Sequence, residues 1–136
     1  MPVSFEIDAD RGLIRTHCSA RTTFEEVMSH FAELRALPSL PQPLDVYLDL
    51  RDIRNLPTLD QLESVAGTTG SLTLELRWGA MAIVASRDVV FGTSRIYEAL
   101  VNHYFEDVRV FRDPVEAEAW IDGLRAARAA GPASGH

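Results

Sequence analysis

The sequence predicts an α/β domain built on a five-stranded mixed sheet, with the element order ββαβαβαβα. Two alternating segments near the N-terminus are separated by turn-forming residues, and they predict an antiparallel hairpin. Short β-rich segments then alternate with segments of helical periodicity, which predicts parallel strands joined by right-handed crossovers. The uninterrupted apolar segment Gly79–Ala85 is typical of a central strand that is covered on both faces.

The first predicted elements are the hairpin and a helix. Val3–Ile7 alternates between apolar and polar residues, and Leu13–Cys18 is a second strand-like segment after the turn Asp8–Gly12. Thr22 and Glu25 have the spacing of a capping box, and the residues after them show helical periodicity. A helix is therefore expected to follow the hairpin.

The middle of the chain is predicted to hold a strand and a second helix. A proline-rich segment at 38–43 ends the first helix, and the strand Asp45–Leu50 follows it. Thr58 and Gln61 form a second predicted capping box. Leucines in the segment 71–78 alternate as in a strand, but glycines precede them, so we interpret this segment as a frayed helix end and a loop.

The C-terminal part is predicted to contain two helices around a last strand. The third helix runs from about Asp88 to His103, and the strand Val108–Phe111 follows it. Asp113 is the expected N-cap of the fourth helix, because proline comes directly after it. We place the domain at residues 1–125 and expect 126–136, rich in Ala and Gly, to be a flexible tail.

Composition favours a soluble protein of the cytoplasm. The 13 Lys and Arg residues are outnumbered by 20 Asp and Glu residues, and no basic cluster is present, so we expect no nucleic-acid partner. No apolar segment is long enough to span a membrane, and the N-terminus has no secretion signal. A single cysteine, Cys18, cannot form an internal disulfide, which agrees with a cytoplasmic location.

Three groups of residues are similar to a known family. They are Tyr47–Leu50; Ala82–Asp88 with Phe91, Gly92 and Arg95; and Val108–Asp113 leading into Glu116–Trp120. On these residues the chain resembles the SpoIIAA-like group of STAS-type domains, also described as STAS/SEC14-like, over residues 3 to about 125. The resemblance implies the fold described above and a regulatory or binding role. Fold alone does not fix function.

One departure from the family concerns its phosphorylation motif. Anti-sigma factor antagonists of this fold carry Leu-Asp-Leu, and then Asp-Ser-Ser-Gly at the start of the second helix, whose second serine is phosphorylated. Leu48–Leu50 matches the first motif, but Pro57–Asp60 occupies the second, and Leu59 replaces the phosphorylated serine. Thr58 keeps a hydroxyl and is the candidate phosphorylation site, although its capping-box spacing gives it a structural role.

Polar residues at predicted strand ends form the candidate site for a ligand or partner. Asp49 either lines a pocket or pairs with its neighbour Arg51. Ser86 and Arg87 follow the central strand, where open α/β sheets bind ligands and helix N-termini favour anions. Simple capping by Ser86 or Asp88 is the alternative. No glycine-rich loop accompanies these residues, so no nucleotide cofactor is expected.

Phe91 falls on the polar face of the third predicted helix, one turn before Arg95. Leaving its ring in water forfeits roughly 1.5–3 kcal/mol, so we expect a cover. The candidates are the second copy in a homodimer, a ligand that Arg95 contacts, or the chain's own loop after Leu50. We favour the homodimer, because a two-fold interface needs one self-complementary patch. The opposite face is expected to pack on the sheet and holds Val89, Val90, Thr93, Ile96, Tyr97, Leu100, Val101 and Tyr104.

The sequence contains no catalytic or metal-binding motif. The histidines (His17, His30, His103 and His136) include no i, i+4 pair, and there is no Gly-x-Ser-x-Gly elbow. We therefore expect no metal or other cofactor and favour a non-enzymatic module that acts through protein contacts or a small bound ligand. A carrier of a small apolar or amphipathic ligand is the second hypothesis. A small enzyme with a spatially assembled site is the third.

Overall fold

The computed structural model describes residues 3–8, 12–37 and 40–134, and the side chains among them up to residue 130. Within these ranges the predicted element order is confirmed. The strands are β1 (Val3–Asp8), β2 (Leu13–Cys18), β3 (Leu44–Asp49), β4 (Trp78–Val84) and β5 (Asp107–Phe111). The helices are α1 (Phe24–Ala36), α2 (Leu59–Ser71), α3 (Asp88–Val101) and α4 (Pro114–Ser134), with the short 3-10 helices η1 (Leu72–Leu74) and η2 (Asn102–Tyr104). None of the described helices is long and apolar enough to cross a membrane.

The strands of the described chain form one five-stranded sheet in the sequential order β1-β2-β3-β4-β5. β1 pairs antiparallel with β2, and β2 to β5 are parallel, which confirms the predicted mixed sheet. The parallel register brings strand ends side by side: His17 pairs with Asp49, and Asp49 pairs with Val84. The carboxyl ends of β2, β3 and β4 therefore meet at one end of the sheet.

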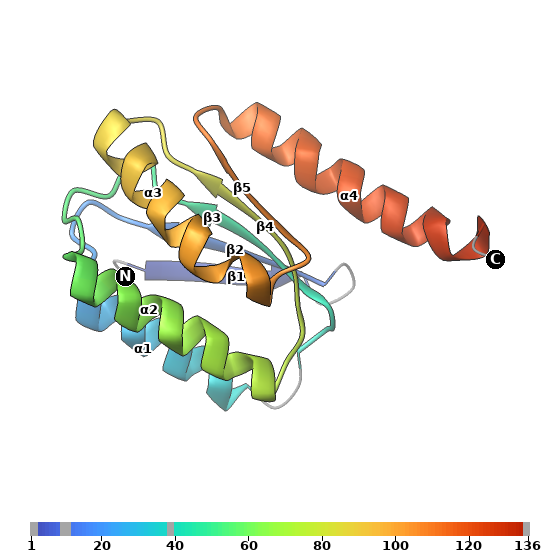
Figure 1. Cartoon of the computed structure of the whole chain (residues 1–136), viewed down its shortest axis with the longest axis horizontal. Helices are drawn as coiled ribbons and strands as arrows, with labels where there is room; N and C mark the ends of the chain where they lie inside the picture. Colours follow the sequence, from blue (N-terminus) through green and yellow to red (C-terminus); the bar gives the residue numbers. More distant parts are fainter. Residues whose placement is uncertain (1–2, 9–11, 38–39, 135–136) are drawn as a thin grey trace.

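The sequential strand order divides the helices between the two faces of the sheet. Crossovers that share one hand and step in one direction place their helices on the same side. Accordingly, α1, α2 and α3 cover one face, and α4 lies on the other (Figure 1). Along β4, Met81 and Ile83 face the three helices, whereas Ala82 and Val84 face α4. All four side chains are buried, which explains why this strand is continuously apolar.

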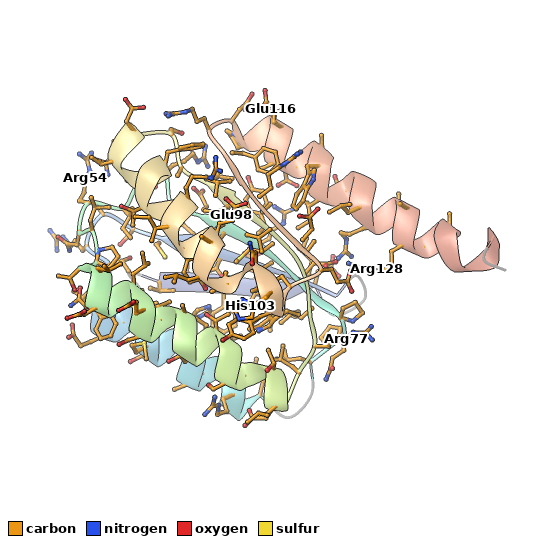
Figure 2. The ribbon with its side chains drawn as sticks, in the orientation of Figure 1. Arg54, Arg77, Glu98, His103, Glu116 and Arg128 are labelled. Carbon is orange, nitrogen blue, oxygen red and sulfur yellow. The ribbon has the colours of Figure 1, made fainter. Side chains whose placement is uncertain are left out.

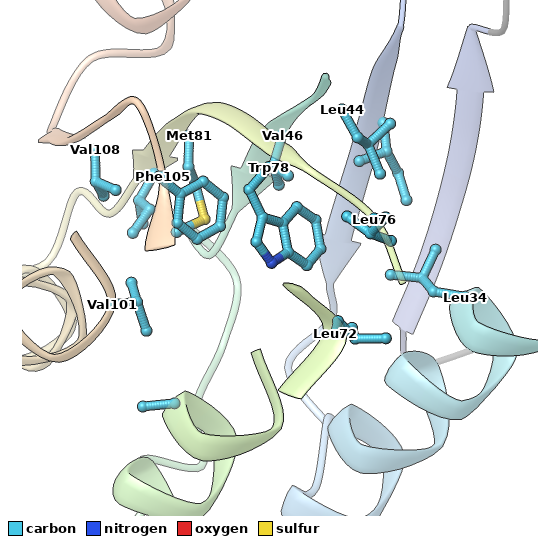
Figure 3. Close-up of a cluster of buried hydrophobic side chains, with 13 residues drawn as sticks. Leu34, Leu44, Val46, Leu72, Leu76, Trp78, Met81, Val101, Phe105 and Val108 are labelled. Atoms are coloured by element: carbon cyan, nitrogen blue, oxygen red, sulfur yellow. The ribbon is translucent and has the colours of Figure 1, made fainter. Parts of the chain in front are cut away.

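The core under α1, α2 and α3 has aromatic residues at the start of β4. The Trp78 indole stacks on Phe105, with ring centroids 5.1 Å apart (Figure 3). Its N–H donates to the backbone carbonyl of Thr69 at 3.1 Å, so its one polar atom is satisfied. Trp78 thus closes this end of the core.

The segment between α2 and β4 is more regular than predicted. Helix α2 continues through Gly70 and passes into η1, so the expected frayed end is not observed. A Cβ at position 70 would overlap the Tyr104 ring, so glycine here lets η2 pack against α2. Leu72 and Leu76 are buried, while Leu74 is 88% exposed, which accounts for the alternating leucines.

One predicted capping box is confirmed and the other is shifted by one residue. Thr58 Oγ1 accepts from the Gln61 N–H at 3.1 Å, and the Gln61 side chain accepts from the Thr58 N–H at 3.0 Å. At α1 the box is formed by Thr23 and Glu26. Thr22, the predicted cap, is 1% exposed and packs inward. Two adjacent threonines left the sequence pattern ambiguous at this point.

A buried carboxylate ties α4 to the sheet. Asp45 of β3 is fully buried, and its side chain bonds Arg125 and Arg128 of α4, the latter at 2.9 and 3.0 Å. It also accepts from the backbone N–H of Ala80 at 2.8 Å. Gly79 leaves the space that this carboxylate occupies, because a Cβ there would overlap Asp45 Oδ1.

Helix α4 begins as predicted and extends past the boundary that we placed at residue 125. Asp113 caps its start by accepting from the Val115 N–H at 2.9 Å. The helix then continues to Ser134. Arg128 also pairs with Glu106 at 3.0 Å, and Figure 2 shows Arg128 beside the segment that leads into β5. Contacts to the sheet therefore lie within the segment that we expected to be a tail.

We predict that Asp45→Asn lowers the free energy of unfolding by about 3 kcal/mol, because it removes the charge that neutralises two partly buried arginines. Chemical denaturation measures this change. Glu118→Gln is the control, since Glu118 bonds Arg15 from the same helix but is 36% exposed, and it should cost less than about 1 kcal/mol. Equal losses in the two variants would contradict a special role for Asp45.

We predict that Thr58→Ala lowers the free energy of unfolding by about 1 kcal/mol, because the Gln61 N–H loses its partner. Thr68→Ala is the matched control within α2. The Thr68 hydroxyl donates to the carbonyl of Ser64 inside the helix, and alanine is the better helix former, so this variant should be neutral or slightly stabilised. If both variants lose the same stability, the capping account is wrong.

Candidate functional site

A cavity of about 360 Å³ lies between the sheet and the layer formed by α1, α2 and α3. It extends from Trp78 at the start of β4 to Leu50 and Ile53 beyond the end of β3. Its wall is mainly apolar and includes side chains such as Val46 and Met81 from the sheet. On the sheet's other face, Ala117 and Ile121 of α4 pack directly against the strands.

Several polar side chains line this mostly apolar cavity, among them Thr16 of β2, His30 of α1 and Ser94 of α3. All three are buried, at 4%, 8% and 3% exposure. His30 Nε2 lies 3.5 Å from Thr16 Oγ1, which is at the outer limit for a hydrogen bond. His30 Nδ1 and Ser94 Oγ are buried without any hydrogen-bond partner among the described residues. Buried polar atoms in native proteins are rarely left in this state.

The electrostatic environment of the cavity favours neutral side chains. Burial lowers the pKa of His30, although the nearby Glu33 carboxylate acts in the opposite direction. Burial also raises the pKa of the Cys18 thiol to about 12, so this thiol is protonated and a poor nucleophile. The desolvated Tyr97 phenol has its pKa raised to about 12, despite a hydrogen bond with Thr69 at 2.8 Å. All these groups are neutral near pH 7.

The polar residues predicted at the end of β3 form a local ion pair. Arg51 donates to both carboxylate oxygens of Asp49, at 3.0 and 2.8 Å. Burial acts to raise the pKa of Asp49, but hydrogen bonds from Arg51 outweigh it, and the net shift is downward. His17 lies 2.8 Å from Asp52 on the same surface. Asp49 therefore has the pairing with Arg51 that the sequence analysis gave as its structural alternative.

The residues predicted after β4 also bond to neighbouring loops. Ser86 Oγ donates to the Arg112 carbonyl at 3.0 Å, and Arg87 donates to the Ile53 carbonyl. Arg112 in turn bonds Asp88 at 2.8 Å. The rule that ligands bind at strand ends applies where the strand order reverses, because the loops there diverge and open a crevice. In this sheet the order never reverses, so adjacent loops contact one another.

Phe91 is half-buried and is covered by the chain itself. Its ring packs against a cluster that includes Ile53, and the Arg112 guanidinium lies 4.3 Å from the ring centroid. Ile53 belongs to the loop after Leu50, so this matches the third cover considered above. Arg95 pairs with Glu98 at 2.9 Å. The homodimer stays a prediction, but the uncovered ring that motivated it is not observed.

The buried stripe of α3 is narrower than predicted. Val90, Ser94 and Val101 are buried, whereas Val89 and Ile96 are 59% and 48% exposed. The buried positions have the i, i+4, i+11 spacing of a narrow contact seam, because α3 fits between α2 and β5. The expectation of a broad apolar arc is therefore wrong at Val89 and Ile96.

None of the six candidates Asp49, Arg51, Ser86, Arg87, Phe91 and Arg95 lines the cavity. The sequence analysis missed the residues that do, but their positions carried a signal. His30 lies three residues after Val27 and four before Leu34, on the apolar stripe of its helix. Thr16 alternates with Ile14 and Cys18 in β2. The available signal was a polar residue at a position where the periodicity of the helix or strand predicts an apolar one.

The described part of the chain holds no group of three or more His, Cys, Asp or Glu side chains arranged to bind a metal ion. Comparison with protein-family models, with curated proteins and with solved structures gives no significant match. The class of this protein is therefore defined by its own geometry: an α/β domain with an apolar cavity under three helices.

We predict that His30 makes stability depend on pH. Its pKa is lowered in the folded state, so the unfolded chain binds the proton first as pH falls below about 6.5, and folding stability is lost there. Denaturation of wild type and His30→Phe between pH 7.5 and about 5 measures the difference. The loss should be smaller in the variant. His103→Phe, at an exposed histidine, should keep the wild-type profile. Identical profiles for wild type and His30→Phe would contradict a neutral, buried His30.

Proposed function

We propose that this protein is a non-enzymatic binding module that holds a small, largely apolar molecule in the cavity between the sheet and α1, α2 and α3. The observation that carries the proposal is the cavity itself, at about 360 Å³ with a mainly apolar wall. A dry apolar cavity of about 150 Å³ is enough to bind benzene. Ligand sites in proteins typically begin near 300 Å³ and combine apolar walls with a few polar groups.

The fold supports a STAS-type, SpoIIAA-like assignment as part of this proposal. Its support is the element order, the sequential sheet and the antiparallel first strand. Of the roles that the resemblance implies, binding of a small ligand fits the cavity better than a phosphorylation switch does. Leu59 has no hydroxyl, and the Thr58 hydroxyl is engaged as a helix cap.

The polar groups in the cavity favour binding over catalysis. A hydroxyl nucleophile needs a histidine at hydrogen-bond distance and a third group that orients the histidine ring. Thr16 lies 3.5 Å from His30, and His30 Nδ1 has no partner among the described residues. Burial also lowers the pKa of His30, which weakens it as a general base. The arrangement therefore suits recognition of a ligand group.

Access to the cavity is expected between α1 and the loop that follows β3. Asn55, Leu56 and Pro57 of this loop line the cavity, and Leu56 is 41% exposed. Asn55 donates to the Thr22 carbonyl at 3.2 Å, which joins the loop to the segment before α1. Displacement of this loop would open a path for a ligand. Such an entry path favours a carrier, which takes up and releases a small apolar or amphipathic ligand.

We predict that the uncharged dye N-phenylnaphthylamine binds the wild-type protein with a gain of fluorescence. Val65→Trp should weaken binding at least about tenfold, because Val65 lines the cavity from α2 and a larger side chain fills the space. Val115→Trp is the matched control, since Val115 is 72% exposed on α4 and far from the cavity wall.

Folding of each variant is checked by circular dichroism. Dye binding that is unchanged in folded Val65→Trp, or absent from wild type, would overturn the proposed function.

A further inference from the structure

The charges around the cavity limit what it can bind, and this inference rests on the proposed function. None of the described residues that line the cavity is Lys or Arg. The one carboxylate among them is Glu25, exposed in the first turn of α1. Deeper in the cavity the titratable side chains are His30, Cys18 and Tyr97, all neutral near pH 7 for the reasons given above. A charged ligand group would therefore be buried without a counter-ion.

The free-energy cost of burying a charge makes the missing counter-ion decisive for which ligands can bind. An ionised carboxylate or ammonium that leaves water needs a partner of opposite charge, because its desolvation otherwise costs far more than apolar contacts return. The ligand's buried part must then be uncharged. Fatty acids and alkylamines are disfavoured on this ground, although their chains suit the apolar wall.

The cavity still presents polar atoms that can form hydrogen bonds with an uncharged ligand. Among the described residues, Ser94 Oγ and His30 Nδ1 have no hydrogen-bond partner, and the two residues line the cavity from α3 and α1. A serine hydroxyl both donates and accepts, and a neutral imidazole nitrogen does one or the other. Each buried atom of this kind gains when a ligand supplies its missing partner. A purely apolar ligand would leave both atoms unsatisfied.

We infer that the ligand is an uncharged, predominantly apolar molecule with a single hydrogen-bonding group, of the alcohol or carbonyl class, and that His30 and Ser94 recognise this group. Thr16 Oγ1 lies 3.5 Å from His30 Nε2, on the other side of the imidazole ring from Nδ1. The apolar part of the ligand extends along the sheet toward Met81 and Trp78.

The test is a competition series against bound N-phenylnaphthylamine with four chain-matched compounds: decanol, decane, decanoate and decylammonium, at pH 7.5. Decanol should bind roughly tenfold tighter than decane, and at least about tenfold tighter than either ion. In Ser94→Ala and His30→Phe the advantage of decanol over decane should fall to about twofold or less, each compound being compared with the variant's own dye affinity. His103→Phe, the matched control, should retain the full advantage.

The outcomes separate the inference from the proposed function. Decanoate or decylammonium binding as tightly as decanol overturns the inference and leaves the binding function in place. A full decanol preference in folded Ser94→Ala also overturns it, whether or not His30→Phe folds. Failure of the dye and of all four compounds to bind the folded wild type defeats the proposed function itself. Ser94→Ala removes one oxygen atom, so it keeps the test decisive if His30→Phe does not fold.

Discussion

The sequential order of the strands is the constraint on which the rest of the structure depends. A sheet that grows by one strand at a time, always in the same direction, places every crossover helix on one face. Helices α1, α2 and α3 must therefore share that face, and the cavity lies beneath them. The opposite face needs its own cover, which α4 supplies through Ala117, Ile121 and the ion pairs of its arginines with Asp45. The two faces of the sheet thus differ: α4 packs directly on one, and the cavity lies between the other and the three helices.

The same constraint explains why the cavity lies under the helices and not at the strand ends. Loops at the strand ends do not diverge, because the strand order has no reversal, and Ser86, Arg87 and Arg112 bond to one another or to Ile53. The apolar cavity lies instead between the sheet and the three helices that cover one of its faces. His30 and Ser94 line this cavity, and each has a buried polar atom without a hydrogen-bond partner among the described residues. In native proteins such atoms call for an explanation, and a bound molecule supplies one.

The fold was predictable from the sequence to a greater extent than the site. Periodicity and capping residues such as Thr58 and Asp113 report local structure, so the element order, the hairpin and the parallel strands followed from them. The sequence did not decide whether Thr22 or Thr23 caps α1, because both threonines fit the capping-box pattern. The site depends on which side chains meet in space. Thr16, His30 and Ser94 come from three elements, and none stands near another in sequence. The candidates predicted from the sequence were mainly polar residues at strand ends, whereas the residues that line the cavity include polar residues on apolar faces.

The central claim is that an uncharged apolar ligand enters between the sheet and the three-helix layer. Nuclear magnetic resonance with side-chain labelling tests it most directly, by mapping chemical-shift changes during titration with decanol. The account predicts changes at Met81, Val65 and the His30 ring, which line the cavity, and little change at Ile121 of α4, which packs on the other face. Shift changes that gather around Ile121, or at the strand-end pair Asp49 and Arg51, with none at His30, would contradict it.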